Sequence, residues 1–168
     1  VATNWGNIGT MSQPLDLHVF RENNNWYGLT INAENNTITR FNFTNSFDNV
    51  PTAVNLGGFG MLAYPTGIFA INDNGFWRVF VTNNGGNSRL VRLDFGNSLL
   101  NAPTAVNLGG IGGSDGLRDL TIFKYCEQVT GFAVNGTTNS LYRLNFATLT
   151  SVPTVTNLGN IGNLSTPH

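Results

Sequence analysis

Short apolar segments separated by polar turns run along the whole chain. DLHVF (16–20) and TRFNF (39–43) alternate apolar and polar positions, whereas GIFAI (67–71) is almost continuously apolar. The segments are rich in Val, Ile, Phe, Tyr and Thr and are bounded by Asn, Gly, Asp or Pro, which is typical of β-strands. Because no ten-residue stretch shows the 3.6-residue period of an amphipathic helix, the pattern predicts an all-β protein.

One decapeptide recurs three times with little change. Residues 51–60 read PTAVNLGGFG, residues 103–112 read PTAVNLGGIG and residues 153–162 read PTVTNLGNIG, at spacings of 52 and 50 residues. Three other apolar segments precede each copy in a constant order, so four predicted strands recur as a unit of about 50 residues. The preceding segments are 16–20, 67–71 and 119–123 (first), 26–32, 77–83 and 129–135 (second), and 39–43, 91–95 and 142–146 (third).

This repeat predicts a β-propeller portion. Asn and Gly in the intervening turns accept the positive φ that tight hairpins need, and four antiparallel strands in about 50 residues make one propeller blade. The decapeptide is interpreted as the outer strand plus the crossover to the next blade. TNWGNIG at 3–9 repeats TNLGNIG at 156–162, which predicts one leading outer strand. The expected segments are 1–10 (leading strand), 11–61, 62–112 and 113–163 (three four-stranded antiparallel blades) and 164–168 (tail).

Three blades do not close a propeller, because closure around an axis takes at least about four. Two arrangements remain. Further repeats of a longer parent chain complete the ring, which is the preferred expectation, or a homo-oligomer closes it, for example two chains giving six blades.

Composition excludes some partners and favours a location. Only 10% of residues are charged, the net charge is −1 and Lys124 is the single lysine, so no basic patch attracts nucleic acid or an anionic membrane. No apolar run is long enough for membrane insertion. Cys126, the only cysteine, is expected to be buried near the end of an inner strand. Few lysines and abundant Asn, Thr and Gly favour an extracellular protein of the bacterial cell surface.

A family resemblance rests on the repeat residues themselves. NNWYGLTIN (24–32), followed by NNTITRFNFTNSF (35–47) and PTAVNLGGFG (51–60), resembles the repeat units of secreted bacterial surface proteins of the gliding-motility and adhesin type, which have NHL-like or TolB-like six-bladed β-propellers. The third unit departs from the pattern at VTG (129–131). The resemblance implies a cell-surface or secreted scaffold and carries over no catalytic residues.

Two acids mark the first candidate site. Asp16 and Asp119 begin the innermost strands of units one and three, where unit two has Gly67. In a propeller these strands line the central channel, so the two carboxylates could hold a divalent cation such as Ca²⁺ together with carbonyls and water. The alternative is that they bond backbone groups at the channel mouth. We therefore expect no cofactor, with Ca²⁺ as the ion to test.

Three further sets of residues recur in register. Arg forks match planar anions, so a repeated sugar or carboxylate pocket is one interpretation, but arginines on the third strands are expected to bond backbone carbonyls or a carboxylate of the neighbouring outer strand and to hold blades together. Phenylalanines three positions after these arginines are expected to pack between blades. Tryptophans are expected to pack there or, where exposed, to stack on sugar rings. The sets are Arg40, Arg92 and Arg143; Phe43, Phe95 and Phe146; and Trp26 and Trp77.

A nucleophile motif is present only in form. GGSDG at 112–116 fits G-x-S-x-G, which requires a strand-to-helix turn, a His and an acid, and we interpret it as an inter-blade loop. The expected function is a non-enzymatic repeat scaffold or binding module that binds glycan or surface protein through propeller loops. The alternative hypothesis is a secreted propeller hydrolase or lyase with a divalent metal in the central channel.

Overall fold

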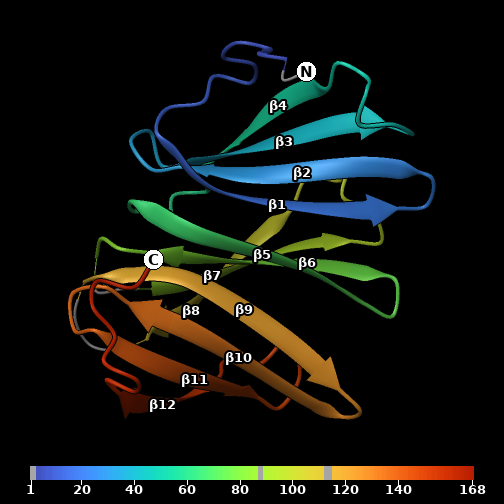
Figure 1. Ribbon diagram of the computed structural model, residues 1–168. Coiled ribbons are helices and arrows are strands. Elements are labelled where there is room, and N and C mark those ends of the chain that lie inside the picture. Colours follow the sequence, from blue (N-terminus) through green and yellow to red (C-terminus); the bar gives the residue numbers. More distant parts are fainter. Residues whose placement is uncertain (1–2, 87–88, 112–114) are drawn as a thin grey trace.

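The protein folds into twelve strands arranged as three four-stranded antiparallel sheets (Figure 1). The computed structural model describes residues 3–86, 89–111 and 115–168. Within these ranges there is no helix, and hence no helix long and apolar enough to cross a membrane. The prediction of an all-β chain with three four-stranded antiparallel units is confirmed.

Each sheet is a meander in which consecutive strands are neighbours. Sheet one contains β1 (Pro14–Glu22), β2 (Asn25–Asn32), β3 (Thr37–Thr44) and β4 (Thr52–Gly57). Sheet two contains β5 (Pro65–Asp73), β6 (Phe76–Asn83), β7 (Arg89–Gly96) and β8 (Thr104–Gly110). Sheet three contains β9 (Leu117–Tyr125), β10 (Gln128–Asn135), β11 (Ser140–Phe146) and β12 (Thr154–Gly159).

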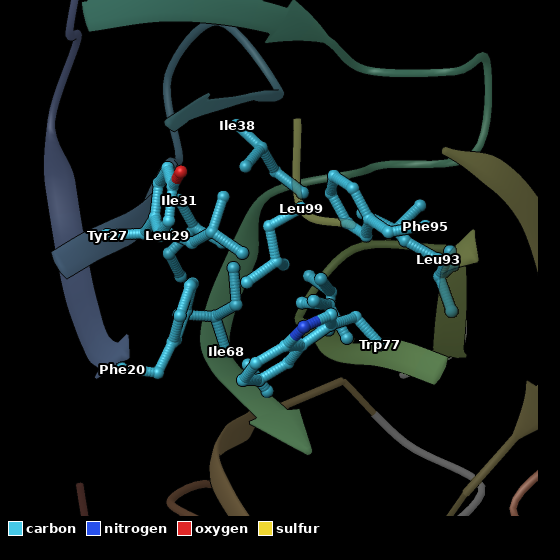
Figure 2. Close-up of a cluster of buried hydrophobic side chains, with 14 of the residues drawn as sticks. Phe20, Tyr27, Leu29, Ile31, Ile38, Ile68, Trp77, Leu93, Phe95 and Leu99 are labelled. Carbon is cyan, nitrogen blue, oxygen red and sulfur yellow. The ribbon is translucent and has the colours of Figure 1, made fainter. Parts of the chain in front are cut away.

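The sheets pack face to face, with sheet two in the middle (Figure 1). The inner strands β1, β5 and β9 contact one another in that order. One buried apolar cluster joins sheets one and two, and Figure 2 shows Tyr27, Leu29 and Ile31 of β2 facing Trp77 and Leu93 of sheet two. A second cluster joins sheets two and three. Because burial of apolar side chains is the main driving force for packing, these two clusters hold the three sheets together.

The repeated decapeptide forms the outer strand and the turn that leaves it. In all four copies of the Asn-x-Gly triplet the Asn Oδ1 accepts a hydrogen bond from the Gly N–H at 2.7–2.9 Å, and the Gly has a φ between 71° and 91°. Asn side chains bond the backbone two residues on, and Gly alone adopts positive φ without strain. The pairs are Asn4–Gly6, Asn55–Gly57, Asn107–Gly109 and Asn157–Gly159.

The predicted leading strand is wrong for residues 3–10, which contain turns and bends and no strand. Each of the outer strands β4, β8 and β12 pairs with the third strand of its sheet, whereas no described strand pairs with residues 3–10. The segment instead lies on the outer face of sheet one, where the carbonyl of Gly9 accepts a hydrogen bond from Thr39 Oγ1 at 3.1 Å. The Trp5 ring lies 6.1 Å from that of Phe43.

Candidate functional site

The two acids predicted to line a channel lie at the starts of the inner strands. Asp16 Oδ1 accepts from the N–H of Leu17 and Oδ2 from the N–H of Ile68 on β5, both at 2.7 Å. Asp119 Oδ1 accepts from the N–H of Leu120 at 2.7 Å. Asp16 therefore ties β1 to β5, which is the backbone-bonding alternative raised by the sequence.

Gly67 interrupts this pattern for a steric reason. A Cβ at residue 67 would lie 2.6 Å from the carbonyl oxygen of Arg118 and 2.9 Å from the Cα of Asp119. The close approach of β5 to β9 thus excludes any side chain in unit two. The repeat could not produce a ring of three carboxylates.

The acids share their end of the molecule with a small cleft of about 320 Å³, whose lining includes Asp16, Arg118 and Asp119. Partial burial raises the pKa of Asp119 above its usual value of 3.8; the Leu120 N–H opposes this shift and the Asp16 carboxylate adds to it. Burial lowers the pKa of His18 below 6.5, although Asp16 and Asp119 act in the opposite direction. His18 is therefore held largely as the neutral imidazole at neutral pH.

This donor set does not fit a resident divalent cation. Ca²⁺ takes six to eight oxygen ligands, whereas both Asp16 oxygens already accept backbone N–H groups and Arg118 brings a positive charge to the cleft. Among the described residues, no group of three or more His, Cys, Asp or Glu side chains is placed to hold a metal ion. The cleft offers hydrogen-bonding groups of both charges rather than a metal centre.

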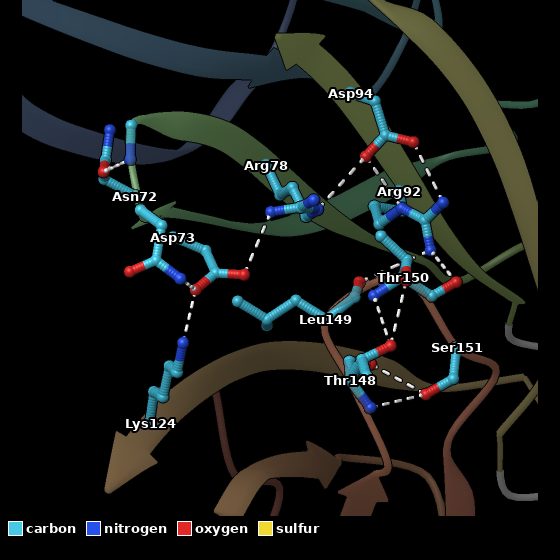
Figure 3. A network of polar contacts seen from close by, with 12 residues as sticks. Asn72, Asp73, Arg78, Arg92, Asp94, Lys124, Thr148, Leu149, Thr150 and Ser151 are labelled. Carbon is cyan, nitrogen blue, oxygen red and sulfur yellow. Dashed lines mark hydrogen bonds and ion pairs between the residues drawn. The ribbon is translucent and has the colours of Figure 1, made fainter. Parts of the chain in front are cut away.

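Two of the three repeated arginines lie where sheets meet. Arg40 Nη1 on β3 donates to the carbonyl of Leu99 in sheet two. Arg92 on β7 donates to the carbonyls of Leu149 (3.4 Å) and Thr150 (2.6 Å) in sheet three, and Figure 3 shows it also paired with Asp94. Each guanidinium therefore bonds the loop between the third and fourth strands of the next sheet. Arg143, on β11 of sheet three, is exposed.

A buried acid that the sequence did not single out completes the first of these contacts. Glu22, at the end of β1, accepts from the N–H of Leu99 at 3.2 Å and from Ser98 Oγ at 3.1 Å. Arg40 thus bonds the backbone carbonyl of Leu99, and Glu22 bonds its backbone N–H. The sequence signal was weak because Glu22 stands beside an Asn-rich turn and reads as a solvated turn residue.

The phenylalanine and tryptophan sets divide between interface and open face. Phe95 belongs to the cluster between sheets one and two, and Phe146 to the cluster between sheets two and three. Trp77 is buried, with its ring 5.2 Å from that of Phe20. Phe43 and Trp26 lie on the outer face of sheet one, in contact with Phe47 at 5.3 and 4.6 Å.

The hairpin end of the molecule, opposite the acids, carries exposed aromatic and amide groups. Phe76 is 53% exposed and Tyr125 is 78% exposed, each next to the turn between the first two strands of its sheet. A groove of about 250 Å³ between the hairpins of sheets one and two is lined mainly by polar side chains, including Arg21, Asn23 and Asn72. Sequence reasoning had treated these residues only as turn formers.

Two predicted positions need separate mention. Cys126, expected to be buried, is exposed, because it occupies the β9–β10 turn with a φ of 52°. In the G-x-S-x-G stretch, residues 112–114, and with them Ser114, lie outside the described residues.

Comparisons with known proteins leave the function to be argued from the structure. No protein-family model matches the sequence, and no curated protein matches it significantly.

Proposed function

We propose that the three sheets are successive blades of a β-propeller, and that the protein is a non-enzymatic repeat scaffold or binding module of a secreted or cell-surface bacterial protein. The blade assignment is supported by the meander in each sheet and by the parallel contacts of β1, β5 and β9 along the inner edge. The resemblance to adhesin and gliding-motility repeats favours the same location and role.

The repeated polar groups support a scaffold because most of them are used in holding sheets together. Arg40, Arg92 and Glu22 bond the loops of neighbouring sheets, and Asp16 bonds the backbone of β5. Acid–base or nucleophilic catalysis requires several such side chains that converge on one point and whose reactive atoms are free to contact a substrate. Of the two acids at this end, Asp16 instead has both carboxylate oxygens bonded to backbone N–H groups, and Asp119 has one oxygen bonded in the same way.

The observation that carries the binding role is the hairpin end. Phe76 presents aromatic surface to solvent beside the Asn74–Gly75 turn, and Tyr125, which adds a hydroxyl, does so beside the Cys126–Glu127 turn. Aromatic faces supply apolar contact area and amides supply both donors and acceptors, a combination that suits the apolar faces and hydroxyl groups of sugar rings. Glycan is therefore the favoured ligand, with protein as the other class.

A glycan array probed with the intact protein tests this role. We expect binding to a subset of immobilised oligosaccharides, weakened at least about tenfold in the Phe76→Ala/Tyr125→Ala variant because each ring contributes contact area. Tyr64→Ala, which removes an exposed tyrosine near the opposite end of the inner strands, is the matched control and should bind as the unaltered protein does. Binding that survives the double substitution, or that responds equally to Tyr64→Ala, would overturn the assignment of the hairpin end.

A further inference from the structure

The two sheet-to-sheet contacts inside the chain follow one scheme. An arginine on the third strand of one sheet donates to a carbonyl in the turn between the third and fourth strands of the next sheet. In each turn one accepting residue is apolar and buried, since Leu99 is 0% exposed and Leu149 is 2% exposed; Arg92 also donates to the carbonyl of the next residue, Thr150, at 2.6 Å. The scheme has a donor face and an acceptor face, so a stack of three sheets leaves one of each unused.

The unused acceptor turn is on sheet one. Phe47 stands at the position of Leu99 and Leu149, four residues before the Pro of the decapeptide, and is 44% exposed. The turn is already formed: the N–H of Asn49 donates to the carbonyl of Ser46 at 3.3 Å, as that of Asn101 does to Ser98 at 3.1 Å. Sheet one thus presents the same turn with its apolar residue uncovered.

The unused donor is on sheet three. Arg143 occupies the register position of Arg40 and Arg92 and is exposed, whereas Arg92 is buried. Phe123 on β9 occupies the position of Phe20 on β1 and is 56% exposed. On the same face, Phe132 and Leu141 are only partly covered.

The aromatic residues of the two open faces match each other. Between sheets one and two, Phe20 packs on Trp77, with ring centroids 5.2 Å apart. At the equivalent place between sheets two and three, both residues are aliphatic, Ile71 and Val129. At the same two positions the open faces carry Phe123 and Trp26. This Phe–Trp combination is that of the contact between sheets one and two, and no aromatic residue is left to face an aliphatic one.

We propose that the open face of sheet three, with Phe123 and Arg143, docks on the open face of sheet one of a second copy of this chain, with Trp26 and Phe47. This proposal rests on the blade assignment above. The contact is head to tail, because the two faces differ, and such contacts close only if the rotation permits. Propellers have about four to eight blades, so copies of three blades close as a ring of six, which is a dimer with two identical contacts.

The leading segment must give way in this dimer. Residues 3–9 and 156–162 carry nearly the same sequence, and Asn7 and Asn160 each bond the carbonyl of the residue four positions later, so both segments form the same turn. In the chain as described, residues 3–9 cover part of sheet one and border a groove of about 420 Å³. In the dimer, residues 156–162 of one copy would occupy the place of residues 3–9 of the other, so the two segments compete. Trp5→Ala, which loosens that segment from Phe43, should tighten the dimer.

Sedimentation velocity of the full chain over a range of concentrations tests the proposal. We expect a dimer at twice the chain mass of 18.2 kDa. The Kd should rise at least about tenfold in Phe123→Ala/Arg143→Ala and in Phe47→Asp. Arg89→Ala is the matched control, since Arg89 is an exposed arginine on the middle sheet, and it should leave the Kd unchanged. A monomer at all concentrations in both the unaltered chain and Trp5→Ala would overturn the proposal.

Mixing the two interface variants separates a head-to-tail contact from a symmetric one. Each variant retains one intact face, so Phe47→Asp and Phe123→Ala/Arg143→Ala should form a heterodimer through a single contact although each alone is a monomer. No association on mixing would contradict the pairing of these faces. The glycan-array result depends on Phe76 and Tyr125, so loss of the dimer with retained glycan binding would refute the docking and leave the proposed function standing.

Discussion

At the scale of single residues, His18 on the inner strand β1 shows how burial and nearby charges act together on one side chain. His18 stacks edge-on against Phe69 of β5 with ring centroids 4.8 Å apart, beside Phe20 on its own strand. Burial there lowers its pKa, even though two carboxylates lie near enough to act in the opposite direction. Desolvation outweighs the charges because the ring packs between aromatic side chains rather than against a single carboxylate.

This lowered pKa makes stability depend on pH. The unfolded chain binds a proton to His18 at a higher pH than the folded chain does, so the free energy of unfolding should fall as the pH drops from the usual value of 6.5 toward the lowered pKa. Thermal melting between roughly pH 8 and pH 5.5 measures this, with His18→Gln as the comparison. An equally steep loss in His18→Gln would show that another group is responsible.

Arg92 is the residue whose loss should cost most at the sheet contacts. Its guanidinium is buried, pairs with Asp94 at 2.9 Å and bonds two carbonyls of sheet three. Arg92→Ala leaves these carbonyls and a carboxylate without partners, which should lower the free energy of unfolding by about 3 kcal/mol. Urea denaturation measures the change. Arg89→Ala, at an exposed arginine of the same strand, should change it by less than about 0.5 kcal/mol, and similar losses in both variants would contradict the role of Arg92.

At the scale of elements, neighbouring inner strands lie so close together that they restrict which side chains fit at the repeated positions. β5 and β9 approach so closely that Thr66 Oγ1 donates to the carbonyl of Leu117 at 2.8 Å, and Thr82 Oγ1 reaches past β5 from β6 to the carbonyl of Arg118 at 3.0 Å. Asp73, at the other end of β5, is ion-paired with Lys124 of β9 (Figure 3). The two strands are thus joined along their whole length.

Gly67→Ala tests that closeness. The added Cβ meets backbone atoms of β9 under 3.0 Å, and backbone cannot rotate away, so the variant should lose about 1–3 kcal/mol of stability in chemical denaturation. Gly28→Ala provides the control, because its nearest neighbours are flexible side-chain ends at 3.3 Å or more. A loss in Gly28→Ala as large as in Gly67→Ala would show that the effect is the strand glycine itself and not the contact with β9.

The elements were the most predictable part of this protein. The four segments of each unit carry β-branched and aromatic residues between Asn- and Gly-rich turns, and the local signals agree with one another in all three units. The leading segment was mispredicted because its sequence matches an outer strand, whereas no described strand lies beside it to pair with. Sequence likeness identified the equivalent position but not the neighbouring strand that a β-strand requires.

The site was less predictable because its properties depend on distances between units. Gly67 stands out in the sequence as a departure from Asp, yet only the proximity of Arg118 explains it. Glu22 and Phe47 have no distinguishing local pattern, and their roles follow from what the next sheet presents. The arginine set was interpretable only in part, since Arg40 and Arg92 do bond carbonyls of the next sheet, but in a loop rather than in the outer strand, and Arg143 is exposed.

At the scale of the whole molecule, the chain is three equivalent sheets with two unlike open faces and a hairpin end rich in exposed aromatic groups. The internal contacts show how one sheet receives the next, through an arginine, a turn carbonyl and an apolar cluster. The proposed stacking of a further sheet accounts for the exposure of Phe47, Phe123 and Arg143 together, because each has a buried counterpart elsewhere in the chain. In the proposed ring the hairpin ends of all blades lie on one side, so the proposed binding loops of several blades would act together.

The most direct test of this account is an experimental map of the particle that the protein forms in solution, with the sheets counted around its axis. The account predicts six sheets in a closed ring, with the guanidinium of Arg143 bonded to the carbonyl of Phe47 of the other copy and Phe123 packed on Trp26. A map that shows three sheets alone, with the Phe123 and Arg143 face open to solvent, would contradict it.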